Sequence, residues 1–254
     1  MATSSHDPGN ATASRAAIGK PQGSGRRKLI YALGIVAACI IGAAATWQFA
    51  FPTDSYRYRY RLTVSIEIDG QMHSGSSVIE VIWKQQPPIV ESGPFRSSIA
   101  GQAAFIDLGA RGAVVAVLHT GDASPDLEKG PRDATWIAGR AFGNNSTNSE
   151  LPELPRLAGR RQLAPDNMPR LFWFSDIADP NTAQPFLPED VQTVFDPRGR
   201  LEAYVEITRV PIVIDVDKKL PWFEKLSVGS PNFGVMYLPK GLALARTMFI
   251  GDAS

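Results

Sequence analysis

The chain has 254 residues, of which 44% are hydrophobic and 20% charged, enough for one soluble domain with its own core besides a shorter terminal region. Its 26 basic and 25 acidic residues nearly cancel, so the composition does not indicate a nucleic-acid-binding protein, which needs a basic face. The single cysteine, Cys39, excludes a disulfide within the chain and a metal site built from several cysteines.

The charges are unevenly distributed along the chain. Residues 1–28 contain five basic residues and one acidic residue, a net charge of +4. The remaining residues therefore hold 21 basic and 24 acidic side chains, a net charge of −3. Because residues 1–28 are rich in Ala, Ser, Gly and Thr and contain few large apolar side chains, we expect a disordered basic tail.

Residues 29–51 form an uncharged apolar segment directly after the basic cluster Arg26, Arg27 and Lys28. As a helix this segment would be about 35 Å long, which is sufficient to cross a hydrocarbon core of about 30 Å. Lys and Arg residues are more numerous before the segment than after it, which predicts a cytoplasmic tail. We therefore expect a single-pass inner-membrane protein of a Gram-negative bacterium, with a lipid bilayer around residues 29–51 and a periplasmic domain at 52–254.

Two other export routes remain open for this segment. Ala43, Ala44 and Ala45 resemble a signal-peptidase site, and cleavage near Ala45 would release a secreted soluble domain. The Arg26-Arg27 pair also loosely resembles a twin-arginine export signal. Aromatic side chains at the far end of the segment, by contrast, are typical of a permanent membrane helix.

Small residues at Gly34, Ala38 and Gly42 fall on one face of the expected membrane helix. This spacing allows two helices to approach closely and is compatible with a homodimer. However, seven Ala and two Gly occur among the 23 residues, so the spacing also arises readily by chance.

Residues 56–69 alternate strictly between apolar and polar side chains, which predicts a strand with one buried face. Asp69-Gly70 then predicts a two-residue hairpin turn, followed by a return strand over about 71–84. This register places Tyr60 opposite Ile79 on the apolar face and Arg59 opposite Glu80 on the exposed face, where we expect a weak ion pair.

Arg57, Arg59 and Arg61 form a row on that exposed face, beginning six residues after the apolar segment. Guanidinium groups bind both lipid phosphates and carboxylates, so the row is a candidate contact for lipid or for an acidic partner protein. The alternative is an ordinary solvated strand face, partly neutralised by Glu67 and Glu80.

The rest of the chain is rich in strand patterns. We expect strands at 103–108, 113–118, 134–142, 171–174, 201–208 and 242–250, a long loop at 143–167, and a short helix at 188–195. A further apolar run covers 212–216. The pattern predicts a mainly β fold: one mostly antiparallel β domain, a sandwich or an open barrel, with one or two short helices.

Four segments carry a resemblance to known proteins: YRYRLTV at 58–64, SGSSVIEV at 74–81, VEIT at 205–208 and KLPW at 219–222. With these segments the chain resembles a family of uncharacterised proteobacterial single-pass membrane proteins. The resemblance implies a bacterial host and supplies no activity and no catalytic residue.

Few residues suggest chemistry. His73 and His119 are the only histidines after the tail, and a hydrolase would have to combine one of them with Ser76, Ser77, Asp107 or Asp122, none of which lies in a nucleophile-elbow pattern. Asp176, Asp179 and Asn181 form an oxygen-rich turn whose spacing does not match a calcium-binding loop. The aromatic segments 172–174 and 222–223 are more typical of a core than of a ligand groove.

These observations favour a membrane-anchored envelope protein with a non-enzymatic binding or scaffolding domain that requires no cofactor and no metal. An unidentified envelope protein is the expected partner. The alternative is an envelope hydrolase whose carboxylates only the fold brings together.

Overall fold

The computed structural model describes residues 54–86, 93–120, 132–145, 147–226 and 234–251. The chain divides into two compact units, 1–52 and 53–254, and every described residue belongs to the second unit. Within the described ranges, no helix combines the length and the apolar character needed to cross a bilayer. The predicted membrane helix, and with it Gly34, Ala38, Gly42 and Ala45, lies outside the described residues.

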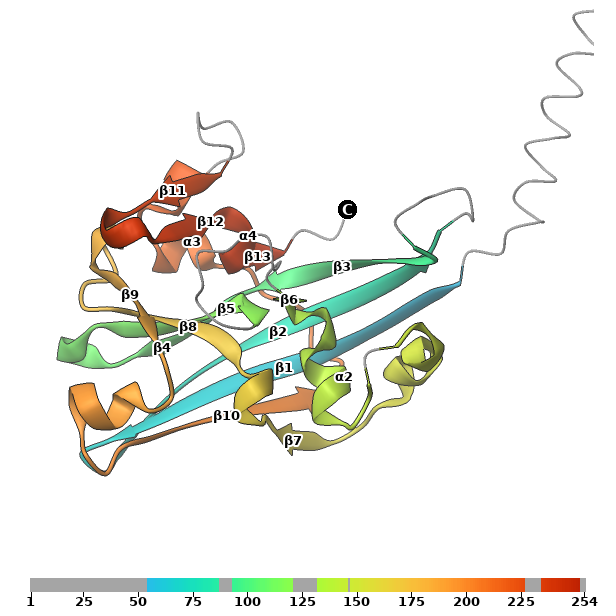
Figure 1. Ribbon diagram of the computed structural model, residues 1–254, viewed down its shortest axis with the longest axis horizontal. Helices are drawn as coiled ribbons and strands as arrows, with labels where there is room; N and C mark the ends of the chain where they lie inside the picture. Colours follow the sequence, from blue (N-terminus) through green and yellow to red (C-terminus); the bar gives the residue numbers. More distant parts are fainter. Residues whose placement is uncertain (1–53, 87–92, 121–131, 146, 227–233, 252–254) are drawn as a thin grey trace, which may run out of the picture. The chain divides into compact units, whose positions relative to one another are not determined.

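The largest element of the second unit is a six-stranded antiparallel sheet with the strand order β13-β3-β2-β1-β10-β7. Figure 1 shows its long strands running side by side, from the blue and teal hairpin to the orange β10. The strands are β1 (Ser55–Ile68), β2 (Gln71–Gln85), β3 (Phe95–Gln102), β7 (Arg160–Gln162), β10 (Arg200–Ile207) and β13 (Ile250–Gly251).

A second antiparallel sheet has the order β4-β5-β8-β9, with β6 also paired to β5. Its strands are β4 (Ala104–Asp107), β5 (Ala113–Thr120), β6 (Arg132–Asp133), β8 (Pro169–Phe174) and β9 (Ala183–Phe186). A small separate ribbon joins β11 (Val235–Tyr237) to β12 (Ala243–Ala245). The mainly antiparallel β fold expected from the sequence is confirmed.

The helices among the described residues are all short. The α-helices are α2 (Ile137–Ala141), α3 (Val216–Lys219) and α4 (Arg246–Phe249). One π-helical turn is η7 (Val191–Phe195). The 3-10 helices are η1 (Gly109–Arg111), η3 (Ala134–Trp136), η4 (Asn148–Arg156), η5 (Pro165–Asn167), η6 (Pro180–Thr182), η8 (Phe223–Leu226) and η9 (Pro239–Gly241).

The β1–β2 hairpin has the register predicted from the sequence. Tyr60 pairs with Ile79 and Arg59 pairs with Glu80, on opposite faces of the two strands. Asp69 and Gly70 have φ angles of 52° and 74°, as a type I′ turn requires. Because a slip of one residue would turn the buried tyrosines outward and the arginines inward, the apolar face and the turn together define a single register.

Two apolar cores lie on opposite faces of the second sheet. The first core lies between the two sheets and includes the inward side chains of β1 and β2 together with Val114 and Ala116 of β5. The second core includes Val115 and Val117 of β5 and side chains of α3, η8 and α4. This arrangement buries every residue of β5, which explains why residues 113–118 are continuously apolar rather than alternating.

The strand predicted at 134–142 is wrong, because the structure has η3 and α2 there. The buried residues Ala134, Ile137 and Ala138 follow helical rather than strand spacing. Tertiary hydrogen bonds anchor this turn: the hydroxyl of Tyr58 donates to the carbonyl of Thr135 at 2.7 Å, and that of Tyr60 donates to the carbonyl of Ala134 at 2.8 Å.

The long loop predicted at 143–167 is also wrong. The helix η4 occupies its centre, and Leu151 and Leu154 are fully buried in the first core. These leucines are three residues apart, the repeat of a 3-10 helix, and Thr147 and Glu150 form a capping box at its start. The segment was predicted as a loop because it contains two prolines and because its three-residue repeat does not match the longer repeat of an α-helix.

Two further expectations are only partly met, and the remaining strand predictions are confirmed. The predicted helix at 188–195 is confirmed for the shorter π-helical turn η7. The predicted last strand at 242–250 is interrupted, because α4 separates β12 from β13. The strands predicted near 103–108, 113–118, 171–174 and 201–208 correspond to β4, β5, β8 and β10.

Candidate functional site

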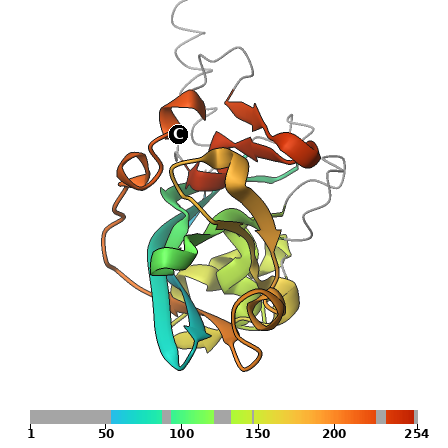
Figure 2. The same cartoon turned by 90° about the vertical axis from the view of Figure 1, so that its left-hand side faces the viewer.

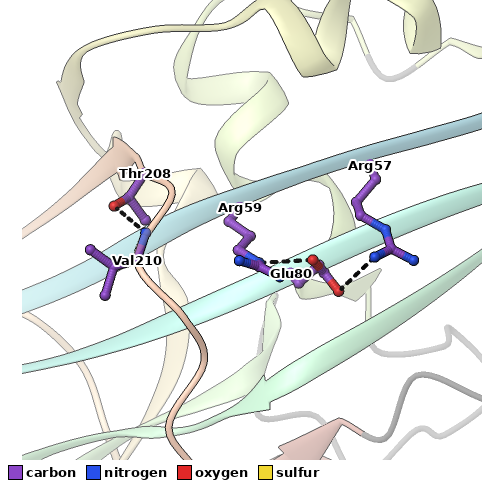
Figure 3. A network of polar contacts seen from close by, with 5 residues as sticks. All are labelled: Arg57, Arg59, Glu80, Thr208 and Val210. Carbon is purple, nitrogen blue, oxygen red and sulfur yellow. Dashed lines mark hydrogen bonds and ion pairs between the residues drawn. The ribbon is translucent and has the colours of Figure 1, made fainter.

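The arginine row lies on the outer face of the β1–β2 hairpin, opposite the first core. Nε of Arg59 donates to Oε1 of Glu80 at 2.8 Å, while Nη1 of Arg57 lies 3.9 Å from Oε2 of the same carboxylate. Figure 3 shows the two guanidinium groups on either side of Glu80. Arg61 lies further along β1, where its Nη1 is 3.4 Å from Oε2 of Glu206 on β10.

The Arg59–Glu80 pair is more buried than the sequence suggested. The side chain of Glu80 is only 8% exposed, that of Arg59 is 33% exposed and that of Arg57 is 59% exposed. Ile82 lies on the same face of β2 and is also buried. Glu80 therefore holds Arg59 as part of the structure, and Arg57 keeps most of its guanidinium surface in water.

A segment that follows β10, residues 208–215, lies next to Arg59, and we call it the strap. The N–H of Thr208 donates to the carbonyl of Arg59 at 3.0 Å and begins the strap beside β1. At its other end, Asp215 forms two hydrogen bonds with Gln102, the last residue of β3. The strap thus passes over the outer face of the first sheet, where Figure 2 shows it in orange beside the blue and teal strands.

The strap is apolar although it is exposed. Its exposed residues include Val210 at 42%, Val213 at 64% and Ile214 at 48%. Arg209 is also exposed, and Figure 3 shows Thr208 and Val210 next to Arg59. We define the outer-face patch as Arg57, Arg59, Arg61 and the strap. Four arginines, against the carboxylates of Asp215 in the strap and of the adjoining Glu80 and Glu206, give the patch a net charge of +1.

A pocket of about 450 Å³ opens elsewhere in the unit, between the β4–β5 connection and the segment after β8. Two carboxylates, Asp107 and Asp176, and one ammonium group, Lys219, line it together with the apolar side chains of Phe105 and Ile177. This volume lies within the usual range of small-molecule sites. Nζ of Lys219 is 3.2 Å from Oδ1 of Asp215 and 5.1 Å from the centre of the Phe105 ring.

The oxygen-rich turn considered for calcium uses its oxygens to hold the backbone. Oδ1 of Asp176 accepts from the N–H of Ala178 at 2.9 Å, and Oδ1 of Asp179 accepts from the N–H of Asn181 at 3.0 Å. Across the described ranges, no group of three or more His, Cys, Asp or Glu side chains has the geometry of a metal site. The turn contacts are those of ordinary Asx turns.

Two of the residues considered for hydrolase chemistry, His73 and Asp107, are in contact, but through the backbone of Asp107. Nδ1 of His73 lies 2.9 Å from the backbone carbonyl of Asp107, not from its carboxylate. His119 is buried near the end of β5, where its backbone lies opposite that of Asp133 on β6. The hydroxyl of Ser77 is buried and has no hydrogen-bond partner in the described part of the chain. Ser76 is exposed, and Asp122 lies outside the described residues.

The aromatic segments form core contacts, as expected. The rings of Phe174 and Trp222 are 5.9 Å apart and lie in the second core with Phe172 and Phe223. The apolar run at 212–216 gave no indication that most of it lies exposed in the strap. A usable signal was Pro211, since a proline within an apolar run argues against a central strand.

Comparison of the chain with protein-family models, with curated proteins and with solved structures finds no match.

Proposed function

We propose that the protein is a membrane-anchored component of a bacterial cell envelope, whose domain at 52–254 acts on the periplasmic side as a non-enzymatic binding or scaffolding module. The anchor is the apolar segment 29–51, with the basic tail in the cytoplasm. The partner is another component of the envelope with acidic groups. This proposal explains a β domain whose histidines and aromatic clusters serve its own packing.

The observation that carries the binding role is the outer-face patch. Arg57 has a mostly exposed guanidinium group and shares its carboxylate with the closer Arg59. Exposed aliphatic side chains of the strap lie beside this charge. Interfaces combine arginine and apolar groups in this way, because the apolar part contributes affinity and the charge steers the partner.

Protease treatment of spheroplasts that carry the full chain with a C-terminal tag tests the location. We expect the tag to sediment with membranes and to be destroyed before lysis. A tag that survives until lysis would place the domain in the cytoplasm, and a tag in the soluble fraction would favour cleavage near Ala45.

A photo-cross-linking residue at Arg57 tests the binding role in the same cells. We expect an adduct of defined mass at Arg57 and none at Arg156, which is a matched control because it is exposed and paired with Glu153. Equal labelling at both positions would argue against a binding site on the outer face.

The pocket lined by Asp107 and Asp176 favours a second candidate, an envelope hydrolase, because two carboxylates in one concavity are the minimal requirement for general acid and base catalysis. The purified chain would then hydrolyse ester, peptide or glycan substrates. That activity would be lost in Asp107→Asn and Asp176→Asn, and loss in His119→Ala would indicate histidine chemistry instead. Any such activity would refute the non-enzymatic proposal.

A further inference from the structure

The strap has the properties of an open strand edge. Three of its side chains, Val210, Val213 and Ile214, are each more than 40% exposed. Its backbone is held at both ends, by Thr208 and by Asp215, while residues 211–214 make no hydrogen bond within the described residues. An exposed apolar segment whose peptide groups have no partner within the described part of the chain can accept another strand.

We propose that the occupant is a second copy of this chain, and that two straps pair antiparallel with Ile212 on the two-fold axis. The register follows from the sequence of the strap itself. It places Ile212 opposite Ile212, Val210 opposite Ile214, Pro211 opposite Val213, and Arg209 opposite Asp215.

Charge complementarity at the ends of the strap supports this register. Arg209 is exposed and forms no ion pair within the described part of the chain. Oδ1 of Asp215 accepts from Gln102 and forms an ion pair with Lys219 at 3.2 Å, and the side chain of Asp215 is still 32% exposed. A single strap therefore carries an exposed arginine at one end and a partly exposed carboxylate at the other, and antiparallel pairing brings each beside its complement twice.

Pro211 determines which peptide groups take part. Residues along an antiparallel strand alternate between hydrogen-bonded and non-hydrogen-bonded positions. When the Ile212 pair is hydrogen-bonded, Pro211 and Val213 occupy the non-hydrogen-bonded positions, where the missing N–H of proline has no cost. The N–H groups of Ile212 and Ile214 then donate to the partner, and the N–H of Val210 keeps its bond to Oγ1 of Thr208.

A second copy supplies hydrogen-bond partners for the peptide groups of the strap, which a lipid surface does not. Free peptide groups that enter the hydrocarbon find no hydrogen-bond partner, whereas a paired strand supplies one for each. The isologous geometry also closes after two copies and so does not lead to filaments. The pairing does not depend on the membrane anchor. Because it covers the apolar part of the outer-face patch, the envelope partner would bind the paired form through Arg57, Arg59 and Arg61.

Disulfide trapping in the purified full chain in detergent tests the pairing. A Cys39→Ser background leaves one introduced thiol, and hydrogen-bonded antiparallel partners have Cα atoms about 5.5 Å apart, within reach of a disulfide. We expect Ile212→Cys to form a dimer with itself under mild oxidation. Val210→Cys and Ile214→Cys should link to each other when the two variants are mixed, and each should link poorly to itself.

Two controls separate pairing from random collision. Val213→Cys is more exposed than position 212 but faces Pro211 in the partner, and Val194→Cys is 46% exposed on the distant η7. We expect Ile212→Cys to link about tenfold faster than either control, the reverse of their order of exposure. Equal rates at all three positions would overturn the proposal.

Arg209→Glu in the Ile212→Cys background tests the register. It replaces two attractive pairs with two repulsive ones, so we expect linking to fall about tenfold. An unchanged rate would refute the register. The unfolding temperature of each cysteine variant should match that of the parent, and the Val210 and Ile214 mixture provides an independent readout if position 212 alone disturbs the strap.

Discussion

The substitution Glu80→Gln tests whether Arg59 contributes to the stability of the fold while Arg57 remains available to a partner. The substitution keeps the size of the side chain and removes its charge. Glu80 is buried, so the change leaves Arg59 with a weaker acceptor in a partly desolvated place. A double-mutant cycle with Arg59→Gln, and a second cycle with Arg57→Gln, isolates the two pairs.

The geometry indicates the size of each coupling energy. Exposed ion pairs contribute about 0.2 to 1 kcal/mol, while breaking a fully buried pair costs about 3 to 5 kcal/mol. Arg59 is 33% exposed and 2.8 Å from a buried carboxylate, so we expect a coupling of about 1 to 2 kcal/mol. Arg57 is 59% exposed and 3.9 Å away, so its coupling should stay below about 0.5 kcal/mol.

Urea unfolding of the full chain in detergent, followed by tryptophan fluorescence, supplies the free energies of unfolding for both cycles. The Arg156–Glu153 pair is the matched control, because both side chains are more than 60% exposed, and its coupling should be close to zero. Equal couplings for Arg57 and Arg59, or a cost below about 0.5 kcal/mol for Glu80→Gln, would refute the assignment of Arg59 to the structure and Arg57 to the surface.

Three further predictions concern the fold. Hydrogen bonds from the N–H groups of Arg198 and Asp69 lower the pKa of Asp196. The ionised carboxylate therefore stabilises the fold at pH values above the pKa of an unfolded aspartate, about 3.9, and this stabilisation is lost as the pH falls below that value. The difference in unfolding temperature between the parent and Asp196→Asn should therefore shrink below about pH 4, and a constant difference down to pH 3 would contradict the lowered pKa. A Cβ at Gly75 would lie 2.0 Å from the carbonyl oxygen of Phe105, so Gly75→Ala should lower the free energy of unfolding in urea by about 3 kcal/mol or more. The exposed Ser76→Ala is the control and should change it by less than about 0.5 kcal/mol. A mild effect at Gly75 would mean that the two sheets are further apart. Leu151→Ala should lower the free energy of unfolding by about 2 to 5 kcal/mol, because Leu151 is fully buried in η4. The control is Leu187→Ala at a half-exposed position. An equally small loss in both variants would support the loop interpretation of this segment.

Some features of this protein could be predicted because their causes are local. The β1–β2 register depends on strict alternation over 56–69 and on Asp69-Gly70, and both lie within one stretch of chain. The strands near 113–118 and 201–208 were likewise visible as apolar patterns of strand length. The small 3-10 repeat of Leu151 and Leu154 was also local, but it was missed because prolines in the same segment suggested a loop.

The sequence by itself determined the apolar segment 29–51, the asymmetry of charge around it, the mainly antiparallel β character of the remaining chain and the register of its first hairpin. Only the tertiary structure decided that Glu80 is buried, that the apolar strap is exposed, and that Asp107, Asp176 and Lys219 share one pocket. The physical reason is that burial depends on what packs against a residue. The strap lies against strands that precede it by more than 100 residues, and Asp215 is hydrogen-bonded to Gln102 of β3. No pattern in the local sequence predicts that contact.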